Sequence, residues 1–406
     1  RSPERVVEAP AAVSIVDIPQ MRTAAITGQL ARAIINIPGV DVTQNGVHDF
    51  NINARGFNST LNRRVLVLQD GRDLALAFLG AQEWTAATPP DEAGRIEMVR
   101  GPGAALYGAN AFSGVLSIST PSARDIAGTK ISLSGGELST FRGDLRQAGV
   151  LADGRLGYKL SGGYSRSDTW SRSRTRNDGL DLSGEYAEAT GVPIGAELRV
   201  EQRPLNGQDT TAGTGAATGE RDPIVQIFGT GRLDYYLDNG AVTTLEGGAT
   251  QVENEIFVTG IGRVQVNKAL RPWARASWSH PNYNVMAWYS GRNSVDPQNS
   301  LLSGAIIDES SSIWHFEGQY NRRFLEDKAR IVLGASYRTT HVNTEGTLLP
   351  TVDDNRTDAY YSGYGQMEYE LTPQLRVVGA ARVDGGDLFD TQFSPKGALV
   401  FSPTED

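Results

Sequence analysis

The sequence predicts a mainly β protein with an N-terminal α/β domain followed by a transmembrane antiparallel β-barrel. Three observations support this fold class. The spacing of apolar residues changes near residue 122, a strict period-two alternation begins after that point, and short connections alternate with long ones between the predicted strands. The predicted domains are therefore residues 1–122 and residues 123–406.

Composition narrows the class of protein. Hydrophobic residues make up 39% of the 406 residues, and no run of about 18 apolar residues predicts a transmembrane helix. A barrel strand turns only every second residue to lipid, so its hydropathy is weak. The net charge of −9 argues against nucleic-acid binding, and the lack of cysteine excludes disulfides and thiolate metal sites.

The first domain contains short elements of both kinds. Residues 13–18 form a β-rich run, and residues 28–36 have helical spacing that Pro38 and Gly39 bring to an end. Further short strands are predicted at residues 51–55, 64–69, 95–100 and 115–120. This mixture predicts a small α/β domain.

About fourteen strands are predicted after the boundary. In residues 313–323, for example, Trp314 and Phe316 alternate with His315 and Glu317. The clearest alternation occurs in residues 155–165, 313–323, 328–338 and 374–384. A soluble β-sandwich also alternates, so the alternation alone leaves both architectures open.

The connections favour the barrel, because membrane barrels have short turns at one end and long loops at the other, whereas a sandwich has no reason to sort its loops. The short connections are residues 152–155, 190–193, 237–240, 280–282, 324–327 and 371–374, and the long ones are residues 166–178, 205–222, 293–310 and 342–356. Aromatic residues expected near strand ends would form the interfacial girdles, although aromatics are common in all strands. They are Tyr235, Tyr236, Trp288, Tyr289, Trp314, Tyr360, Tyr361 and Tyr369.

The first 122 residues resemble the plug domain of TonB-dependent outer-membrane receptors. The motifs, in the family's order, are Ala54-Arg55-Gly56-Phe57, Gln69-Asp70-Gly71-Arg72, Arg95-Ile96-Glu97-Met98-Val99-Arg100-Gly101-Pro102 and Ala105-Leu106-Tyr107-Gly108. The resemblance implies a plug inside a barrel of about 22 strands, in the outer membrane of a bacterium. With about fourteen strands counted, and with Arg1 and Asp406 as the ends, we expect a fragment of a longer receptor.

The resemblance places ligand contacts on the plug apices and the extracellular loops. On the plug these residues are Phe57, Asn58, Phe78 and Trp84. Aromatic rings beside amides suit a flat ligand with polar edges, but Phe57 and Phe78 are equally compatible with packing inside the plug.

A basic loop is the second candidate for ligand contact. Residues 166–178 contain Trp170, Arg172, Arg174 and Arg176, and arginine clusters bind anionic groups while tryptophan stacks on rings. An anionic ferric chelate would fit this loop. Contact with lipopolysaccharide phosphates, or simple solvation, are the alternatives.

Three charged residues of the plug predict a latch. Arg95, Glu97 and Arg100 lie on one short strand, and in a plug that fills a barrel they can pair with opposite charges on the lumen wall. The alternative is a solvated strand edge.

No catalytic constellation, metal site or cofactor site is predicted, because neither a nucleophile–base set nor ligand spacing occurs around the four histidines. The resemblance implies active import of a scarce ligand, with a ferric siderophore as the first choice. The implied partners are a TonB-type inner-membrane energy-coupling complex, outer-membrane lipid and lipopolysaccharide. The alternatives are a non-transporting structural or surface-binding subunit and, less favoured, a soluble β-rich enzyme.

Overall fold

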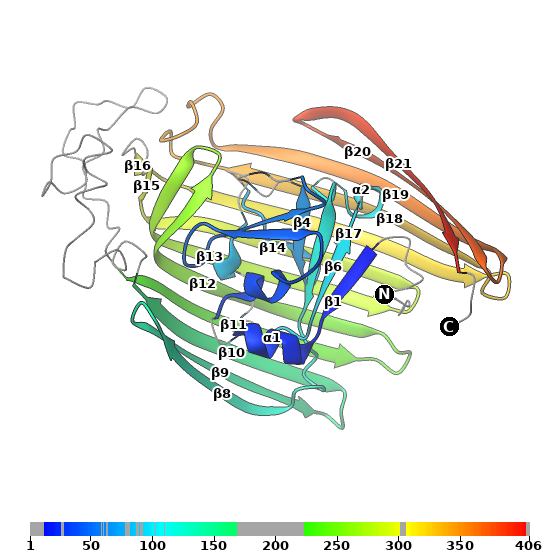
Figure 1. Cartoon of the computed structure of the whole chain (residues 1–406), viewed down its shortest axis with the longest axis horizontal. Coiled ribbons are helices and arrows are strands. Elements are labelled where there is room, and N and C mark those ends of the chain that lie inside the picture. Colours follow the sequence, from blue (N-terminus) through cyan, green and yellow to red (C-terminus); the bar gives the residue numbers. More distant parts are fainter. Residues whose placement is uncertain are drawn as a thin grey trace, which may run out of the picture.

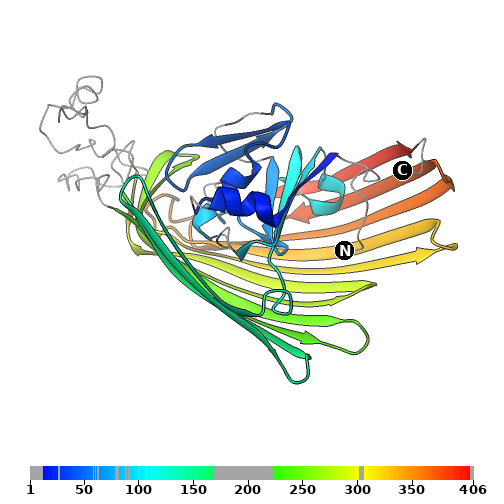
Figure 2. The ribbon, with the colours of Figure 1, turned by 60° about the horizontal axis from the view of Figure 1, so that its bottom comes forward.

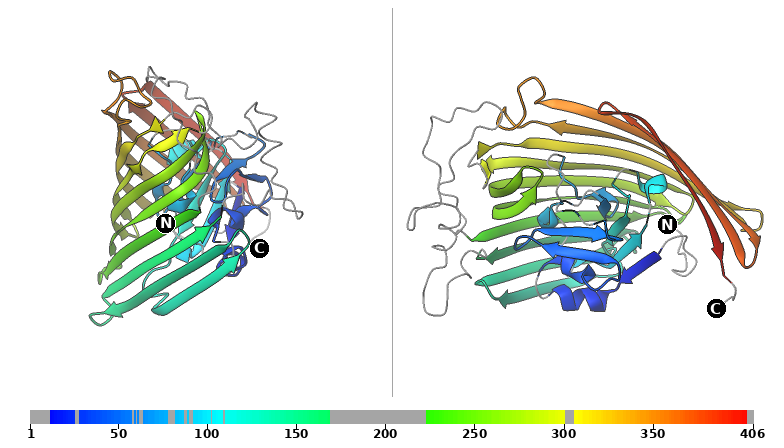
Figure 3. Two further views of the ribbon diagram at one scale, coloured as in Figure 1. Left: turned by 90° about the vertical axis from the view of Figure 1, so that its left-hand side faces the viewer. Right: turned by 45° about the horizontal axis from the view of Figure 1, so that its top comes forward.

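The computed structural model describes residues 12–168, 223–300 and 306–402, except for residues 26–27, 58, 60, 62–63, 78–81, 87–88, 90–91, 102 and 109. In this part of the chain a large antiparallel sheet curves around a small N-terminal α/β domain (Figure 1). Viewed from other directions, the sheet forms a curved wall with the domain seated in its hollow (Figures 2 and 3). Among these residues, no helix has the length and apolar character to cross a membrane.

The N-terminal domain combines a five-stranded sheet, in the order β1-β6-β7-β4-β5, with a separate β2-β3 hairpin. Its strands are β1 (Ala12–Val16), β2 (Val40–Gln44), β3 (Phe50–Ala54), β4 (Val65–Gln69), β5 (Arg72–Asp73), β6 (Arg95–Arg100) and β7 (Gly114–Ser119). Its helical elements are α1 (Ile18–Ala25), η2 (Leu30–Ile34), η3 (Trp84–Ala86) and α2 (Ala104–Tyr107).

The first helix begins earlier than the sequence predicted. Asp17 and Gln20 exchange hydrogen bonds between side chain and backbone amide, at 3.0 and 3.1 Å, which is a capping box, and Pro19 suits the first turn. These features begin α1 at Ile18, inside the predicted strand 13–18. The predicted helix at residues 28–36 is reduced to the short 3₁₀ element η2.

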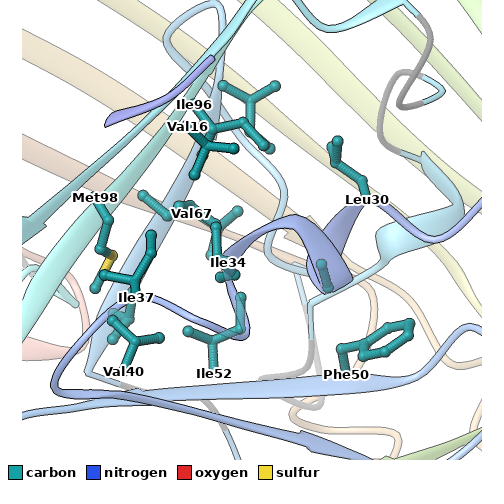
Figure 4. Packing of buried hydrophobic residues seen from close by; sticks show 14 of the residues in the cluster. Val16, Leu30, Ile34, Ile37, Val40, Phe50, Ile52, Val67, Ile96 and Met98 are labelled. Carbon is teal, nitrogen blue, oxygen red and sulfur yellow. The ribbon is translucent and has the colours of Figure 1, made fainter. Parts of the chain in front are cut away.

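The domain has an apolar core of its own (Figure 4). Ile34, Ile52, Ile96 and Met98 are each at most 1% exposed. They join the helical segment, the hairpin and the sheet, and full burial of each such side chain contributes about 1.5–3 kcal/mol. All members of this core lie between residues 16 and 118, so the large sheet contributes nothing to it.

The large sheet has fourteen strands, which confirms the prediction of a mainly β protein. Twelve follow one another in the order β8 to β14 and then β17 to β21, while β15 and β16 form a small extension beside β13. Their bounds are β8 (Gly128–Gly136), β9 (Thr140–Leu151), β10 (Leu156–Ser167), β11 (Ile224–Tyr236), β12 (Val242–Thr259), β13 (Gly262–His280), β14 (Tyr283–Asp296), β15 (Gln298–Ser300), β16 (Ile306–Ile307), β17 (Ser310–Phe324), β18 (Ala329–Val342), β19 (Arg356–Thr372), β20 (Leu375–Gly386) and β21 (Phe389–Phe401).

Connection lengths follow the prediction at one end of the sheet. The connections there are short, at residues 152–155, 237–241, 281–282, 325–328 and 373–374. At the other end, residues 297–309 and 343–355 are long, but residues 137–139, 260–261 and 387–388 are tight turns that were not predicted. The predicted connections at 190–193 and 205–222, and most of 166–178, lie outside the described residues.

The aromatic girdle prediction is wrong for Trp288. This residue lies in the middle of β14, points into the hollow and is 2% exposed, whereas Trp314 on β17 is 48% exposed on the outer face. Period-two alternation shows which residues of a strand share a face. Which of the two faces is the inner one becomes clear only when the position of the N-terminal domain is known. Tyr235 and Tyr236 do end β11.

A glycine at the turn before β5 brings the domain close to the sheet. Gly71 has φ +86°, and an added Cβ would lie 3.0 Å from both Sδ and Cε of Met286. We expect Gly71→Ala to weaken docking of the domain, by about 1 kcal/mol from backbone strain and by more where the flexible thioether cannot yield. The measurement is the urea midpoint for loss of the domain's protease resistance.

Gly56→Ala is the matched control, because Gly56 has φ +72° and open space around its added Cβ. Gly56→Ala should show the effect of backbone strain without any contact with Met286. Gly71→Ala combined with Met286→Ala should return to the midpoint of that control. Equal urea midpoints for Gly71→Ala and Gly56→Ala would show that the contact with Met286 does not affect docking.

Candidate functional site

The interface between the N-terminal domain and the sheet combines ion pairs with apolar contacts of Leu76 and Ala77. The domain supplies carboxylates and the sheet supplies guanidinium groups. Glu83 lies 2.7 Å from Arg271 on β13 and 2.7 Å from Arg292 on β14, and Asp73 lies 2.9 Å from Arg338 on β18. The contrast with the apolar core of the domain is sharp, and it makes this interface the candidate functional site.

Glu83 is the centre of the largest network. Arg271 also binds Glu255 at 3.1 Å, and Arg292 also binds Glu309, so two cations are shared among three carboxylates. All five side chains are at most 8% exposed. Removing one member of such a group leaves an uncompensated buried charge, which costs about 3–5 kcal/mol.

Thr85, in the middle of the short helix η3, holds this helix against the sheet. Thr85 donates its hydroxyl to Glu255 at 3.2 Å and accepts a hydrogen bond from Arg271. Its carbonyl oxygen accepts a hydrogen bond from the Gln226 amide at 2.8 Å. Side chain and backbone of Thr85 therefore both contact the wall.

A second contact lies at the loop between β2 and β3. The Asp49 carboxylate accepts a hydrogen bond from the Val258 amide of β12 at 2.9 Å. Burial raises the pKa of Asp49 to about 6, against the opposing effect of this hydrogen bond, and the nearby charge of Glu255 raises it further. Burial lowers the pKa of the adjacent His48, which favours its neutral form.

Arg72 makes the third type of contact. Its guanidinium lies 4.6 Å from the centre of the Trp273 ring, and it donates to Ser290 Oγ at 3.3 Å and to the Ala86 carbonyl at 3.4 Å. Burial lowers the pKa of Arg72 to about 10, which still leaves it charged at neutral pH. A cation over an indole ring in a desolvated setting contributes about 2 kcal/mol.

The aromatic ligand candidates on the domain have different surroundings. Phe57 is 43% exposed, its ring lies 5.3 Å from that of Phe112, and the Arg64 guanidinium lies over both rings. Trp84 instead lies in the core of the domain, where its Nε1 donates to the Phe50 carbonyl at 2.8 Å. Phe57 remains accessible to a ligand, whereas Trp84 packs inside the domain.

The three latch residues bind groups of their own domain, contrary to the prediction. Arg95 pairs with Glu97 at 2.7 Å, and Arg100 donates to the Pro38 carbonyl and to Ser14 Oγ. Residues two apart on a strand share one face, so Arg95 and Glu97 reach each other before either reaches the wall. In the described part of the chain, ion pairs to the wall come from Asp73, Glu83 and Glu92 instead.

The remaining ligand candidates lie outside the described residues and stay predictions: Asn58, Phe78, Trp170, Arg172, Arg174 and Arg176. Within the described ranges, no group of three or more histidine, aspartate or glutamate side chains is arranged to hold a metal ion.

The sequence contained a sign of the wall residues that was missed. Arg271, Arg292 and Arg338 are basic residues within alternating strands, on the face opposite the exposed apolar residues. A charge on the inner face of a predicted barrel must meet either lumen water or a plug group. Which carboxylate it meets depends on how the domain is seated, and strand periodicity does not specify that.

Comparison with known proteins places these features in a family context. Residues 5–115 match the model of the TonB-dependent receptor plug domain. The chain is 32% identical over 134 residues to a vitamin B12 transporter, BtuB, of Vibrio vulnificus, and this alignment covers 32% of the chain and 21% of the transporter.

Solved structures share the fold over nearly the whole chain. The siderophore receptor PirA of Pseudomonas aeruginosa matches with a TM-score of 0.65 at 18% identity, covering 98% of this chain and 62% of that one. The ferric yersiniabactin uptake receptor FyuA of Yersinia pestis matches with a TM-score of 0.59 at 12% identity, covering 98% and 63%. The chain thus spans about three-fifths of the length of these receptors.

Glu83 provides a direct test of the interface. Glu83→Gln removes the charge that Arg271 and Arg292 share, so docking should weaken by about 3–5 kcal/mol while the core of the domain remains intact. Hydrogen exchange of η3 should rise strongly, with little change at β4 and β7. Glu97→Gln is the control, since Glu97 pairs only with the exposed Arg95 among its described ion pairs. Similar exchange in the two variants would contradict the central role of Glu83.

The raised pKa of Asp49 predicts that docking depends on pH. Because this pKa lies above the ordinary value of 3.8, the stability it contributes is complete below about pH 4 and is lost as the pH rises through about 6. Urea midpoints for loss of docking should therefore fall between pH 4 and pH 7 more steeply in the parent than in Asp49→Asn. Asparagine keeps the acceptor for Val258 without the charge. Parallel pH profiles would rule out this contribution.

Proposed function

Since residues 5–115 belong to the plug domain family of TonB-dependent receptors and the chain has the plug-and-barrel fold of these outer-membrane receptors, we propose that it imports a scarce ligand across the outer membrane. In this proposal the ligand binds from outside and the plug then moves away from the wall. The chain is an outer-membrane protein, like the receptors it resembles.

The observation that carries the proposal is the charged plug–barrel interface. A plug that must leave the wall and return should expose little apolar surface when it does so. Asp73 and Glu83 exchange arginine partners for water, while the apolar core of the plug stays closed. Buried ion pairs suit this role because they fix one arrangement while adding little net stability over hydrated charges.

The proposed substrate class is a ferric siderophore. The arginines of the inner wall favour anionic ligands, and the basic loop with Arg172, Arg174 and Arg176 remains part of this proposal. Support also comes from the fold, which is shared with siderophore receptors. The exposed Phe57 and Phe112, with Arg64 over their rings, would offer a further contact for a flat anionic group.

The proposed energy source is a TonB-type inner-membrane complex, because full displacement of the plug breaks the ion pairs of Asp73, Glu83 and Glu92 together. Outer-membrane lipid and lipopolysaccharide are the proposed surroundings of the outer face. That face carries exposed apolar side chains, including Leu160 and the cross-strand pair of Leu233 and Leu245.

A corrinoid is the second candidate ligand, favoured by the similarity to a vitamin B12 transporter. That similarity covers 134 residues, which are 32% of this chain and 21% of the transporter. Ligand choice in such receptors depends on loops, and so short an alignment leaves most of the transporter uncompared, so the ferric chelate remains the first proposal.

Uptake by cells that make the full receptor tests the function. Iron-labelled ferric siderophores and labelled cobalamin would be offered to energised cells, with and without a protonophore. We expect energy-dependent uptake of a ferric siderophore and energy-independent surface binding. Surface binding without uptake of any chelate would favour the structural or surface-binding alternative, and uptake of cobalamin alone would assign the second candidate.

A further inference from the structure

One level of the inner wall carries a row of side chains in cross-strand register. From β11 to β18 this row consists of Arg232, Glu246, Arg275, Trp288, His315 and Arg338, each paired with the next across neighbouring strands. Side chains directly opposite one another lie within contact distance, so the row is continuous. It contains three arginines and one carboxylate.

The β11 end of the row is neutralised within the sheet. Glu246 pairs with Arg275 at 2.5 Å and with Arg232 at 3.8 Å, and Arg232 also binds Asp234 at 2.9 Å. Two arginines therefore meet two carboxylates of the wall itself. This half of the row does not depend on the plug for its counter-charges.

The β18 end has a different arrangement. The Trp288 and His315 rings are stacked with centres 5.2 Å apart, and the Arg338 guanidinium lies 5.6 Å from the centre of the Trp288 ring. Each of the three carries a buried nitrogen without a hydrogen-bond partner among the described residues: Trp288 Nε1, His315 Nδ1 and Arg338 Nε. Buried polar groups without partners are uncommon and costly, and three on adjacent strands form a cluster that can serve an acceptor-rich group.

A segment of the plug covers this cluster. Asp73, only 3% exposed, accepts a hydrogen bond from Arg338 Nη2 at 2.9 Å. Ala77 packs against Trp288 and its apolar neighbours Met286 and Ile313. The plug thus places a carboxylate on the one arginine of the row that has no carboxylate partner in the described part of the wall.

We propose that Trp288, His315 and Arg338 form a second recognition site, inside the barrel, for a ligand that bears oxyanions, and that Asp73 occupies this site while the plug is docked. The inference rests on the proposed import function and assigns a second contact to the same ligand. Arginine binds planar oxyanions through paired N–H groups, and the stacked rings accept a flat face. Exchange of Asp73 for a ligand oxyanion keeps Arg338 paired throughout, so the plug leaves without stranding a buried charge.

Two matched substitutions separate recognition from tethering. Arg338→Gln and Asp73→Asn remove the same ion pair, one from the wall and one from the plug. If the pair only tethers the plug, both variants should behave alike. If Arg338 also binds the ligand, only Arg338→Gln should slow uptake of an anionic ligand.

The probes are a trianionic ferric tris-catecholate and a neutral ferric tris-hydroxamate. We expect Arg338→Gln to slow uptake of the anionic chelate about tenfold or more, the effect of losing one charge-assisted contact, with less than about a twofold change in surface binding. Asp73→Asn removes the carboxylate that competes for Arg338 and keeps the arginine for the ligand, so uptake of the anionic chelate should not slow. Equal losses in both variants, or no loss in Arg338→Gln, would overturn the proposal.

Hydrogen exchange of residues 72–77 in the purified receptor gives a readout that does not need transport. A ligand that competes with Asp73 for Arg338 must raise exchange in this segment, by linkage. The anionic chelate should raise it in the parent and not in Arg338→Gln, and the effect should weaken with salt. Absence of any rise, or an equal rise in both proteins, would reject the second site. A rise in the parent alone without cellular uptake would reject the import function and retain the site.

Discussion

The sharing of Arg271 and Arg292 by Glu83 is the interaction on which the rest of the structure depends. It joins the plug to two neighbouring strands of the wall at one buried point, and Thr85 and Asp49 hold the adjoining segments against the same wall. A single carboxylate with two cationic partners fixes both position and orientation, because neither arginine is paired fully if the plug rotates or slides.

The distribution of apolar surface follows from this arrangement. The plug encloses its apolar residues in its own core, and the wall directs many of its apolar residues outward, as at Leu233 and Trp314. Charged and hydrogen-bonding groups then dominate the surface between them. The plug and the wall can therefore be held rigidly when they are docked, and water can hydrate the polar surfaces that face each other when they separate.

The strands and the short turns could be predicted from the sequence, because period-two alternation and turn residues are local properties. The start of α1 at the Asp17–Gln20 capping box was also local and readable. The partners of the charges were not. Arg95 pairs with Glu97 on its own strand, whereas Arg338 pairs with Asp73, which is 265 residues away in the sequence. Which long-range pair forms depends on how the plug is seated, and no periodicity contains that information.

The closure of the plug core within residues 16–118 has a consequence for assembly. The N-terminal domain is synthesised first, and all the apolar contacts of its main core are available before the first strand of the wall exists. Apart from β15 and β16, the strands of the wall pair in the order in which they follow one another along the chain, so the sheet can be extended strand by strand beside this domain. The sheet is therefore built around a domain that can already be folded. Arg271, Arg292 and Arg338 then determine where this domain docks as the strands are added.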